Sequence, residues 1–435
     1  MSTAFQLASG VEEFQLEENG LRVLLKPVPT SNAVSVWVVY KVGSRNEHPG
    51  LTGASHWVEH MMFKGGGKLG KGEVHALVSA EGGRNNAFTD QDLTAYYETL
   101  PREKLETALF IESERMTKSS FLREEVASER QVIISEREGS ENYPTYQLRE
   151  ELFSTAFRVH PYRWPVVGWK SDLRKMTRED LYAHYRRFYH PNNAVLVICG
   201  NFQVKPTMDL VRRYFSPIKS VADPRSSDVG FAEPDQRGER TSKLQLPGTL
   251  NYLGAGFHVP SIMHEDMPAL IVMSTILGGW RGLVGFSGDR YTPRSNRLYR
   301  RLVDGKLASE VDMYFPVNLD PGLLYCNVTI LPSVSIERAR AALLSELSAI
   351  SDSPPNEDEM LVAFNQIKSW HAYENDGVTL QAQSIGLMEA LGKRSLADDL
   401  ISKALQVTPE QVSAVARKYL AERNRTVCEY ESRTS

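Results

Sequence analysis

The chain has 435 residues, of which 41% are hydrophobic and 24% are charged. This composition is typical of a globular protein long enough for two sizeable domains. A net charge of -4 and a pI near 6.3 argue against nucleic-acid binding, because phosphate contacts need a basic surface. No apolar run approaches membrane-spanning length, and the first residues lack the pattern of a secretion signal. We therefore expect no membrane insertion and a cytoplasmic protein of bacterial type.

The first half begins with two apolar, strand-like stretches, "GLRVLLKPV" at 20–28 and "AVSVWVVYKV" at 33–42. A loop rich in Gly and Pro then leads into a helix that we expect to start near Leu51 or Ser55. Two more strand-like stretches follow, "NNAFT" and "LTAYYETL", and the pattern from about 102 to 156 predicts long helices. The half therefore mixes strands and helices in a way typical of an α+β fold.

The end of the first half is repeated at the end of the second. At an offset of 231 residues, Thr177 matches Thr408 and Asn193 matches Asn424. Each threonine is placed to cap a helix that a strand follows. The polar stretch between the halves, rich in Pro, Ser, Asp and Gly, indicates a linker. We predict two similar α/β-sandwich domains with antiparallel-rich sheets, at 1–219 and 243–435, joined by a linker at 220–242. A chance match between two helix-strand endings is the alternative.

The stretch "HWVEHMMFKG" at 56–65 places three titratable groups on one face of an otherwise apolar helix. His56, Glu59 and His60 stand at i, i+3 and i+4, so their side chains project together. Two imidazoles one helical turn apart are a good pair of Zn²⁺ ligands, and a carboxylate beside them is suited to act as a general base. The matching early helix of the second half, "MPALIVMSTILGG", has neither His nor Glu.

A third ligand is offered by "ASERQVIISEREGSE" at 127–141. If this segment is a helix, Glu129, Val132, Ile133 and Glu136 share one face, which we expect to point inward. We predict Glu136 as the third ligand. Glu129, two turns earlier, is predicted to orient a ligating histidine. Glu138 and Glu141 are expected to point elsewhere.

The order H-x-x-E-H, with a glutamate 76 positions after the second histidine and another glutamate seven before that one, resembles the inverzincin metallopeptidases, the family of pitrilysin, insulysin and the mitochondrial processing peptidase. The stretches "GGRNNAFTDQDLTAYYETL" and "FYHPNNAVLVICGNF" resemble the family as well. The resemblance is to the half-length bacterial members and to the zinc-bearing β subunit of the processing peptidase. It implies a zinc-dependent endopeptidase with one Zn²⁺ per chain.

The same resemblance implies an edge strand that binds an extended peptide by backbone pairing next to the zinc. We assign this role to Asn86, Ala87 and Phe88, and an ordinary hairpin strand is the alternative. A non-catalytic assembly or peptide-binding subunit is the alternative to an enzyme.

Full activity in the resembling family also uses an Arg and a Tyr seven residues apart in the second domain. The matching stretch "NRLYRRLVDGKLASE" carries Val303 and Glu310 at those positions, and Arg300, Arg301 and Tyr314 do not restore the spacing. We therefore expect a heterodimer in which a similar subunit supplies Arg and Tyr. A symmetric homodimer is the alternative.

Other candidates have simpler interpretations. His75 is expected to pack on a helix surface, and His48 and His160 to lie in turns or in solvent. The glycines around 278–288 lack the order of a phosphate-binding loop. The three cysteines, Cys199, Cys326 and Cys428, lie far apart in apolar runs, which predicts buried free thiols.

Overall fold

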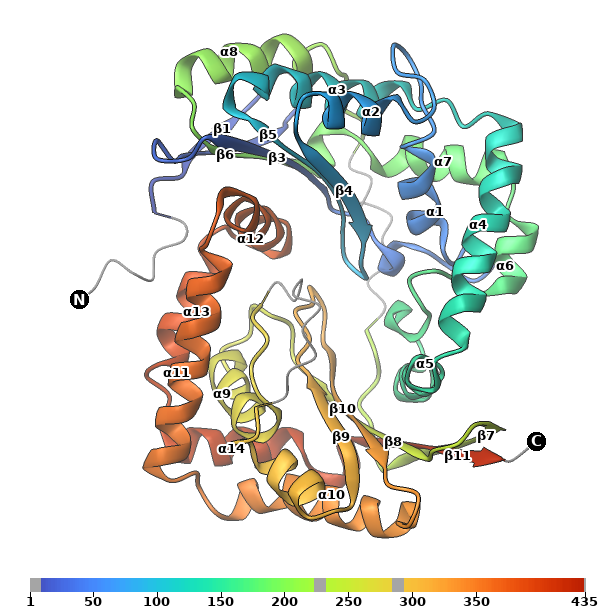
Figure 1. The fold of residues 1–435 in the computed structure, drawn as a ribbon, viewed down its shortest axis with the longest axis vertical. Helices are drawn as coiled ribbons and strands as arrows, with labels where there is room; N and C mark the ends of the chain where they lie inside the picture. The colour runs from blue at the N-terminus through green and yellow to red at the C-terminus, as the bar shows by residue number, and fades with distance from the viewer. Residues whose placement is uncertain (1–8, 223–231, 284–292, 434–435) are drawn as a thin grey trace.

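The computed structural model describes residues 9–222, 232–283 and 293–433. Two β-sheets face each other across the middle of the molecule, and helices cover them (Figure 1). The predicted α+β fold is thus confirmed. The predicted linker at 220–242 lies partly outside the described residues, and its last three residues belong to the first strand of the second sheet.

The first sheet has six strands in the order β1-β2-β6-β3-β5-β4. Strand β3 lies inside it and is rich in valine, which suits a pleated surface that is buried on both faces. Strand β4 is the last in the order and, among the described strands, pairs with β5 alone. The strands are β1 (Glu12–Gln15), β2 (Arg22–Pro27), β3 (Ala33–Tyr40), β4 (Arg84–Thr89), β5 (Thr94–Pro101) and β6 (Ala194–Gly200).

The second sheet repeats this pairing pattern with five strands in the order β7-β11-β8-β10-β9. In each sheet one parallel pair, β2 with β6 or β7 with β11, adjoins a run of antiparallel pairs. The common topology shows that the halves share one fold, as the repeated sequence predicts. The strands are β7 (Arg240–Pro247), β8 (Tyr252–Val259), β9 (Ala308–Tyr314), β10 (Gly322–Ile330) and β11 (Arg425–Arg433).

The repeated helix ends are also alike. The side chains of Thr177 and Thr408 both accept a backbone N–H at the third helical residue, and both helices carry a complete capping box. These two helices are α7 (Arg178–Phe188) and α14 (Pro409–Tyr419).

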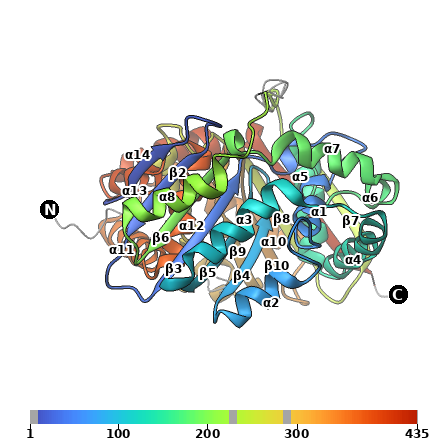
Figure 2. The same ribbon diagram turned by 90° about the horizontal axis from the view of Figure 1, so that it is seen from above.

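The remaining helices flank the sheets (Figures 1 and 2). In the first half they are α1 (Ala54–Met61), α2 (Glu73–Ala80), α3 (Leu105–Lys118), α4 (Arg123–Glu141), α5 (Pro144–Ala156), α6 (Lys170–Lys175) and α8 (Val204–Phe215). In the second half they are α9 (Met267–Gly278), α10 (Ile336–Asp352), α11 (Glu357–Glu374), α12 (Val378–Leu391) and α13 (Leu396–Ala404). No helix among these described segments is long and apolar enough to cross a membrane.

Two helices cross between the halves and interlock them (Figure 1). Helix α12 of the second half packs on β3 and β6 of the first sheet. Its Gly386 allows the close approach, because a Cβ there would lie 3.0 Å from Val39 and 3.1 Å from Val197. In return, α5 of the first half packs on β8 and β11, with Leu148 and Leu152 in a buried cluster. Each sheet is therefore completed by a helix from the other half.

A buried polar network also joins the halves. The Asp92 carboxylate accepts a hydrogen bond from the Tyr162 hydroxyl at 2.7 Å and from the backbone N–H of Leu319 at 2.9 Å. Asp320 pairs with Arg45 at 2.5 Å and with His160 at 3.1 Å. Because these groups are satisfied only when both halves are in place, the network favours one arrangement of the halves.

The three cysteines are buried and free, as predicted. The prediction that His160 lies in a turn or in solvent is confirmed for the turn. Its Nδ1 accepts the backbone N–H of Tyr162 at 3.2 Å, so it does cap a turn, but the side chain is buried and not in solvent. Sequence reasoning missed Asp320, its partner across the two halves.

Candidate active site

Helix α1 carries His56, Glu59 and His60 on one face. It begins after Gly53, whose φ of 89° is in the left-handed region that favours glycine. The Glu47 carboxylate accepts the backbone N–H groups of Gly53 and Ser55, both at 2.7 Å. Since the first N–H groups of a helix have no partner within the helix, this carboxylate fixes where α1 begins. Glu47 was not recognised from the sequence.

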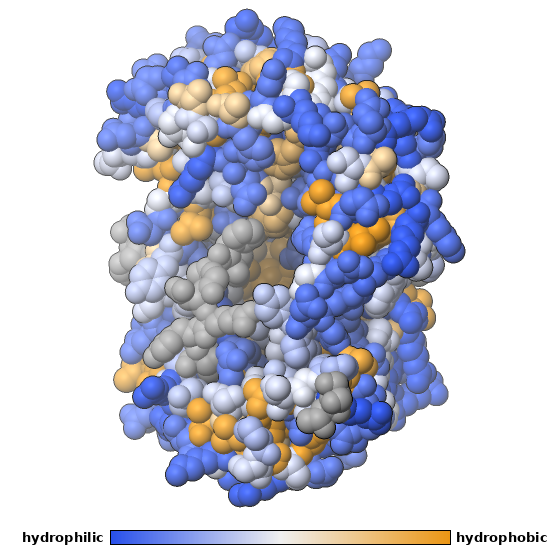
Figure 3. Space-filling model, turned by 45° about the vertical axis from the view of Figure 1, so that its right-hand side comes forward, coloured by the Kyte–Doolittle hydropathy of each residue, from blue (hydrophilic) through white to orange (hydrophobic). Residues whose placement is uncertain are grey.

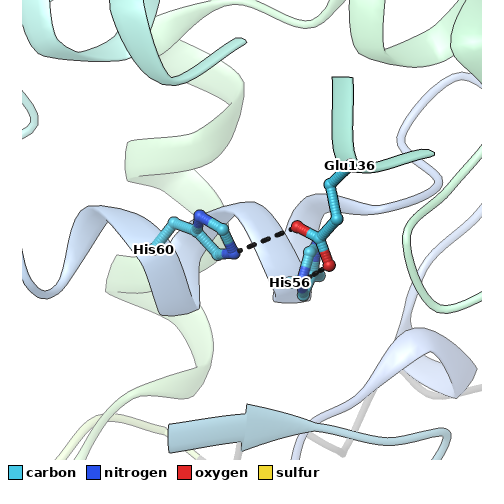
Figure 4. Close-up of side chains that lie close together, drawn as sticks. All are labelled: His56, His60 and Glu136. Carbon is cyan, nitrogen blue, oxygen red and sulfur yellow. Dashed lines mark ion pairs between the residues drawn. The ribbon is translucent and has the colours of Figure 1, made fainter. Parts of the chain in front are cut away.

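Helix α4 brings Glu136 to the two histidines (Figure 4). The distance from His56 Nε2 to Glu136 Oε1 is 3.7 Å, and that from His60 Nε2 to Glu136 Oε2 is also 3.7 Å. Ligand atoms of the three residues all lie within 4.8 Å of one another. Glu136 is 45% exposed at its side chain, whereas His56 is buried. These three residues, called the metal group below, are therefore covered by protein on one side and open to solvent on the other.

The donor set fits a zinc ion. Tetrahedral zinc with bonds of about 2.0–2.2 Å needs ligand atoms about 3.4 Å apart, and the separations of 3.7 Å are close to that. Burial and the neighbouring His60 lower the pKa of His56 to about 3, which keeps this imidazole neutral and able to donate a lone pair. Three protein ligands with one open side are typical of catalytic zinc sites, whereas structural zinc sites are closed by four.

Glu129 lies behind His60. Its Oε1 is 2.8 Å from His60 Nδ1, and its Oε2 is 2.5 Å from Lys64 Nζ. The hydrogen bond to Glu129 and the nearby carboxylates raise the pKa of His60 against the opposing effect of burial. Glu129 thus holds the ring so that Nε2 faces Glu136. Lys64 was missed, although its place one turn after His60 is a usable signal.

Glu59 lies on the same face of α1 as the two histidines and contacts the end of β4. Its Oε2 accepts a hydrogen bond from the Thr89 hydroxyl at 2.7 Å. Burial raises the pKa of Glu59 to about 7, a value that suits a group exchanging protons near neutral pH. Thr89 ends β4 and was not recognised, because only the tertiary structure brings this strand beside α1.

The three residues predicted to bind peptide lie on the edge strand. Asn86, Ala87 and Phe88 pair with β5, opposite Tyr97, Tyr96 and Ala95. No strand of the described segments pairs with the other edge of β4. Such an edge offers backbone groups to an extended chain.

The inward face predicted for α4 is correct for three of its four residues. Glu129 and Ile133 are buried and Glu136 reaches the histidines, but Val132 is 48% exposed. A helix turns 100° per residue, so Val132 lies at the margin of the face rather than at its centre.

The acids expected to point elsewhere do so. Glu138 lies 3.5 Å and Glu141 2.5 Å from Lys170 Nζ. His75 stacks on Phe63 with ring centroids 5.0 Å apart, so it packs on a helix surface as predicted. His48 is exposed.

The group borders a cavity of about 340 Å³ between α1, α5 and the end of β4. The space-filling view shows a hollow between the two halves, with hydrophobic residues deep in it (Figure 3). The cavity is lined by His56, Thr89, Asp90, Gln91, Glu136, Tyr146, Arg149, Glu150, Phe153, Arg163, Trp164, Pro165, Val166 and Val167. A peptide segment therefore has room next to the open side of the group.

Comparison with known proteins identifies the family of the chain. The profile described as Insulinase (Peptidase family M16) matches residues 22–168, and the profile described as Peptidase M16 inactive domain matches residues 175–367. The chain belongs to the M16 peptidase family. The half that matches the inactive domain is also the half whose early helix, α9, is wholly buried and bears no His or Glu.

Relatives in this family are named as zinc proteases. The zinc protease PqqE of Helicobacter pylori is 33% identical over 264 residues, which is 60% of this chain and 60% of that protein. The probable mitochondrial-processing peptidase subunit beta of Arabidopsis thaliana is 25% identical over 93% of this chain and 76% of that protein. The crystal structure of a protease from Helicobacter pylori superposes with a TM-score of 0.90 at 26% identity, covering 97% and 99% of the two chains.

The candidate metal site can be tested by comparing zinc binding in variants of three glutamates on α4. Glu136→Gln should greatly reduce bound zinc, because an amide is a poor ligand beside two imidazoles. Glu129→Gln should weaken zinc binding by about 10 to 100-fold, as changes behind a ligand do. Glu138→Gln is the matched control and should bind zinc like the unaltered chain. Metal content by elemental analysis and competition with a chelator give both quantities. Equal zinc in Glu136→Gln and the unaltered chain would move the third ligand elsewhere.

Proposed function

We propose that this chain is a zinc-dependent endopeptidase subunit that hydrolyses extended or unfolded peptides. The observation that carries the proposal is the convergence of His56, His60 and Glu136 from two helices, with Glu59 beside them and an open edge strand alongside. His56, His60 and Glu136 are the residues that would hold one zinc ion. A zinc ion bound there would lower the pKa of a bound water to about 7 and polarise a peptide carbonyl.

Residues of the chain supply proton transfer, positioning of the side chains and binding of the peptide. The Glu59 carboxylate takes the proton of the attacking water and delivers it to the leaving amine. Thr89 holds that carboxylate in place, and Glu129 keeps the ring of His60 in its orientation. The backbone of Asn86, Ala87 and Phe88 pairs with the peptide and presents one of its bonds to the site.

A non-catalytic assembly or peptide-binding subunit is the competing function. It would need the edge strand and the cavity but no metal group. The presence of a complete donor set together with an acid whose pKa is raised to about 7 favours catalysis, because a peptide-binding role gives no reason for either.

The partner proposed for this chain is a similar subunit that supplies the absent Arg and Tyr. At the two matching positions Val303 is half-buried against the second-domain core, and Glu310 is exposed on β9. Valine offers no hydrogen-bond donor, and a carboxylate would repel a developing oxyanion. Tyr314 is stacked on Tyr325 with centroids 4.7 Å apart. A heterodimer closed over the zinc site is therefore proposed, with a symmetric homodimer as the alternative.

The role of Glu59 gives the first test. Glu59→Gln should keep the fold and the zinc but reduce turnover by at least about 100-fold, because the amide preserves shape and takes no proton. Hydrolysis of a flexible peptide with a fluorescent reporter measures the rate, and elemental analysis measures zinc. Loss of zinc in this variant would make Glu59 a ligand, and retained turnover would remove it as the base.

The partner proposal gives the second test. The zinc-loaded chain alone should cleave a flexible peptide slowly, and addition of a similar subunit that carries Arg and Tyr but lacks the histidines should raise the rate by at least about tenfold. A subunit with its Arg and Tyr replaced is the control. Undiminished cleavage by the lone chain would contradict the heterodimer.

A further inference from the structure

Helix α5 presents a polar face to the cavity. Tyr146, Arg149, Glu150 and Phe153 stand at i, i+3, i+4 and i+7, and all four line the same cavity as His56 and Glu136. The opposite face of α5 is buried against the second sheet. The helix is therefore fixed from behind, and whatever its polar face binds is held at a set place relative to the metal group.

Most polar groups around this cavity are already bonded within the chain. Both oxygens of Glu150 accept hydrogen bonds from Arg137, at 2.7 Å and 2.9 Å, and the Tyr146 hydroxyl accepts a third from it at 3.3 Å. Arg163 donates to the backbone carbonyl of Arg158 at 2.8 Å. The single acid on this face of α5 is thus neutralised by its own ion pair.

Arg149 differs from these groups. Its side chain is exposed to the cavity, and the guanidinium lies over the ring of Phe153, 5.6 Å from the centroid. Among the residues that the structure describes, no carboxylate lies within ion-pair distance of it. Tyr325 and, more weakly, Asp90 raise the pKa of Arg149, so it is charged at any working pH. Its guanidinium carries five N–H donors and faces the substrate space, and no hydrogen-bond acceptor for it is found in the described part of the chain.

We propose that Arg149 binds a carboxylate of the peptide substrate next to the scissile bond. This inference rests on the proposed function, since it places the peptide in the cavity. Thr89 and Asp90, where β4 ends, line the same cavity as Arg149, so a peptide extended along β4 reaches it. Guanidinium and carboxylate pair in a planar, two-pronged geometry that neither an amide nor a cation reproduces. The chain therefore prefers peptides with an acidic group at this subsite over neutral or basic ones.

The carboxylate has two possible sources, an Asp or Glu side chain and the C-terminus of the peptide. Both have the same chemistry, and the test separates them. The probes are short labelled peptides that differ at one position, with Glu, Gln or Lys there, each made with a free and an amidated C-terminus. They are titrated against the zinc-loaded full chain carrying Glu59→Gln, so that binding is measured without turnover.

The Glu peptide should bind at least about tenfold more tightly than the Gln peptide, and Lys should bind most weakly. Adding Arg149→Gln should remove the difference between Glu and Gln, Arg149→Lys should retain part of it, and Arg149→Glu should favour Lys. Arg163→Gln is the matched control, because it removes the same charge from the same cavity, and it should keep the preference. If the terminal carboxylate is the bound group instead, the Glu and Gln peptides should bind alike, amidation should weaken both, and Arg149→Gln should remove that effect of amidation.

Equal affinity for the Glu and Gln peptides that amidation leaves unchanged would overturn the role of Arg149. So would an equal loss of affinity in Arg149→Gln for every peptide, free and amidated alike, since Arg149 would then act on groups other than a carboxylate. In both cases retained zinc and binding of the Gln peptide would leave the proposed function standing. Absence of both zinc and binding of any peptide would instead contradict the proposed function and the inference together.

Discussion

The packing of α4 against α1 is the contact on which the site depends. One helix supplies two imidazoles and the other supplies the carboxylate, so neither helix forms the group alone. Ile133 is buried in the core, Arg130 lies over the ring of Trp57 at 5.3 Å, and Glu129 bonds to His60. These contacts lie within two turns of Glu136 and fix it relative to α1. A shift of about 1 Å there would separate the ligand atoms beyond what one metal ion spans.

The duplication of the fold explains how the two halves are arranged around the cavity. Two halves of one fold exchange helices, with α12 on the first sheet and α5 on the second. The exchange leaves a hollow between the sheets, and α5 carries residues of the first half into it. Among the described residues, the one group that could hold a metal ion lies in the first half, so the second half is free to act as a wall of the cavity. The asymmetry of chemistry on a symmetric scaffold is consistent with function residing in a site rather than in the fold.

Much of this arrangement could be predicted from the sequence, because the signals are local. The spacing of His56, Glu59 and His60 is a property of one helical turn, and Glu129 and Glu136 lie two turns apart on one helix. The strands and the repeated Thr caps are likewise local patterns. Thr89, Lys64 and Arg149 were missed for different reasons. Lys64 has a helical signal that was overlooked, whereas Thr89 and Arg149 reach the site only through tertiary contacts.

Two further details depend on tertiary packing. Val132 was placed on the inward face by its spacing, but spacing alone does not say how wide the covered face is, and the side chain is half exposed. The turn at His160 is predicted correctly, but its partner Asp320 lies 160 residues away in the other half and has no local signal. The spacing of apolar residues along a helix or strand predicts which face is buried. It does not predict which distant part of the chain packs on that face.

The central claim is that two helices converge to hold one zinc ion at His56, His60 and Glu136. Anomalous diffraction from crystals of the full chain grown with zinc, recorded above and below the zinc absorption edge, tests it most directly. The account predicts one strong peak per chain, about 2.0–2.2 Å from Nε2 of both histidines and from a Glu136 oxygen. A chain without a peak there, or with its peak at other residues, would contradict it.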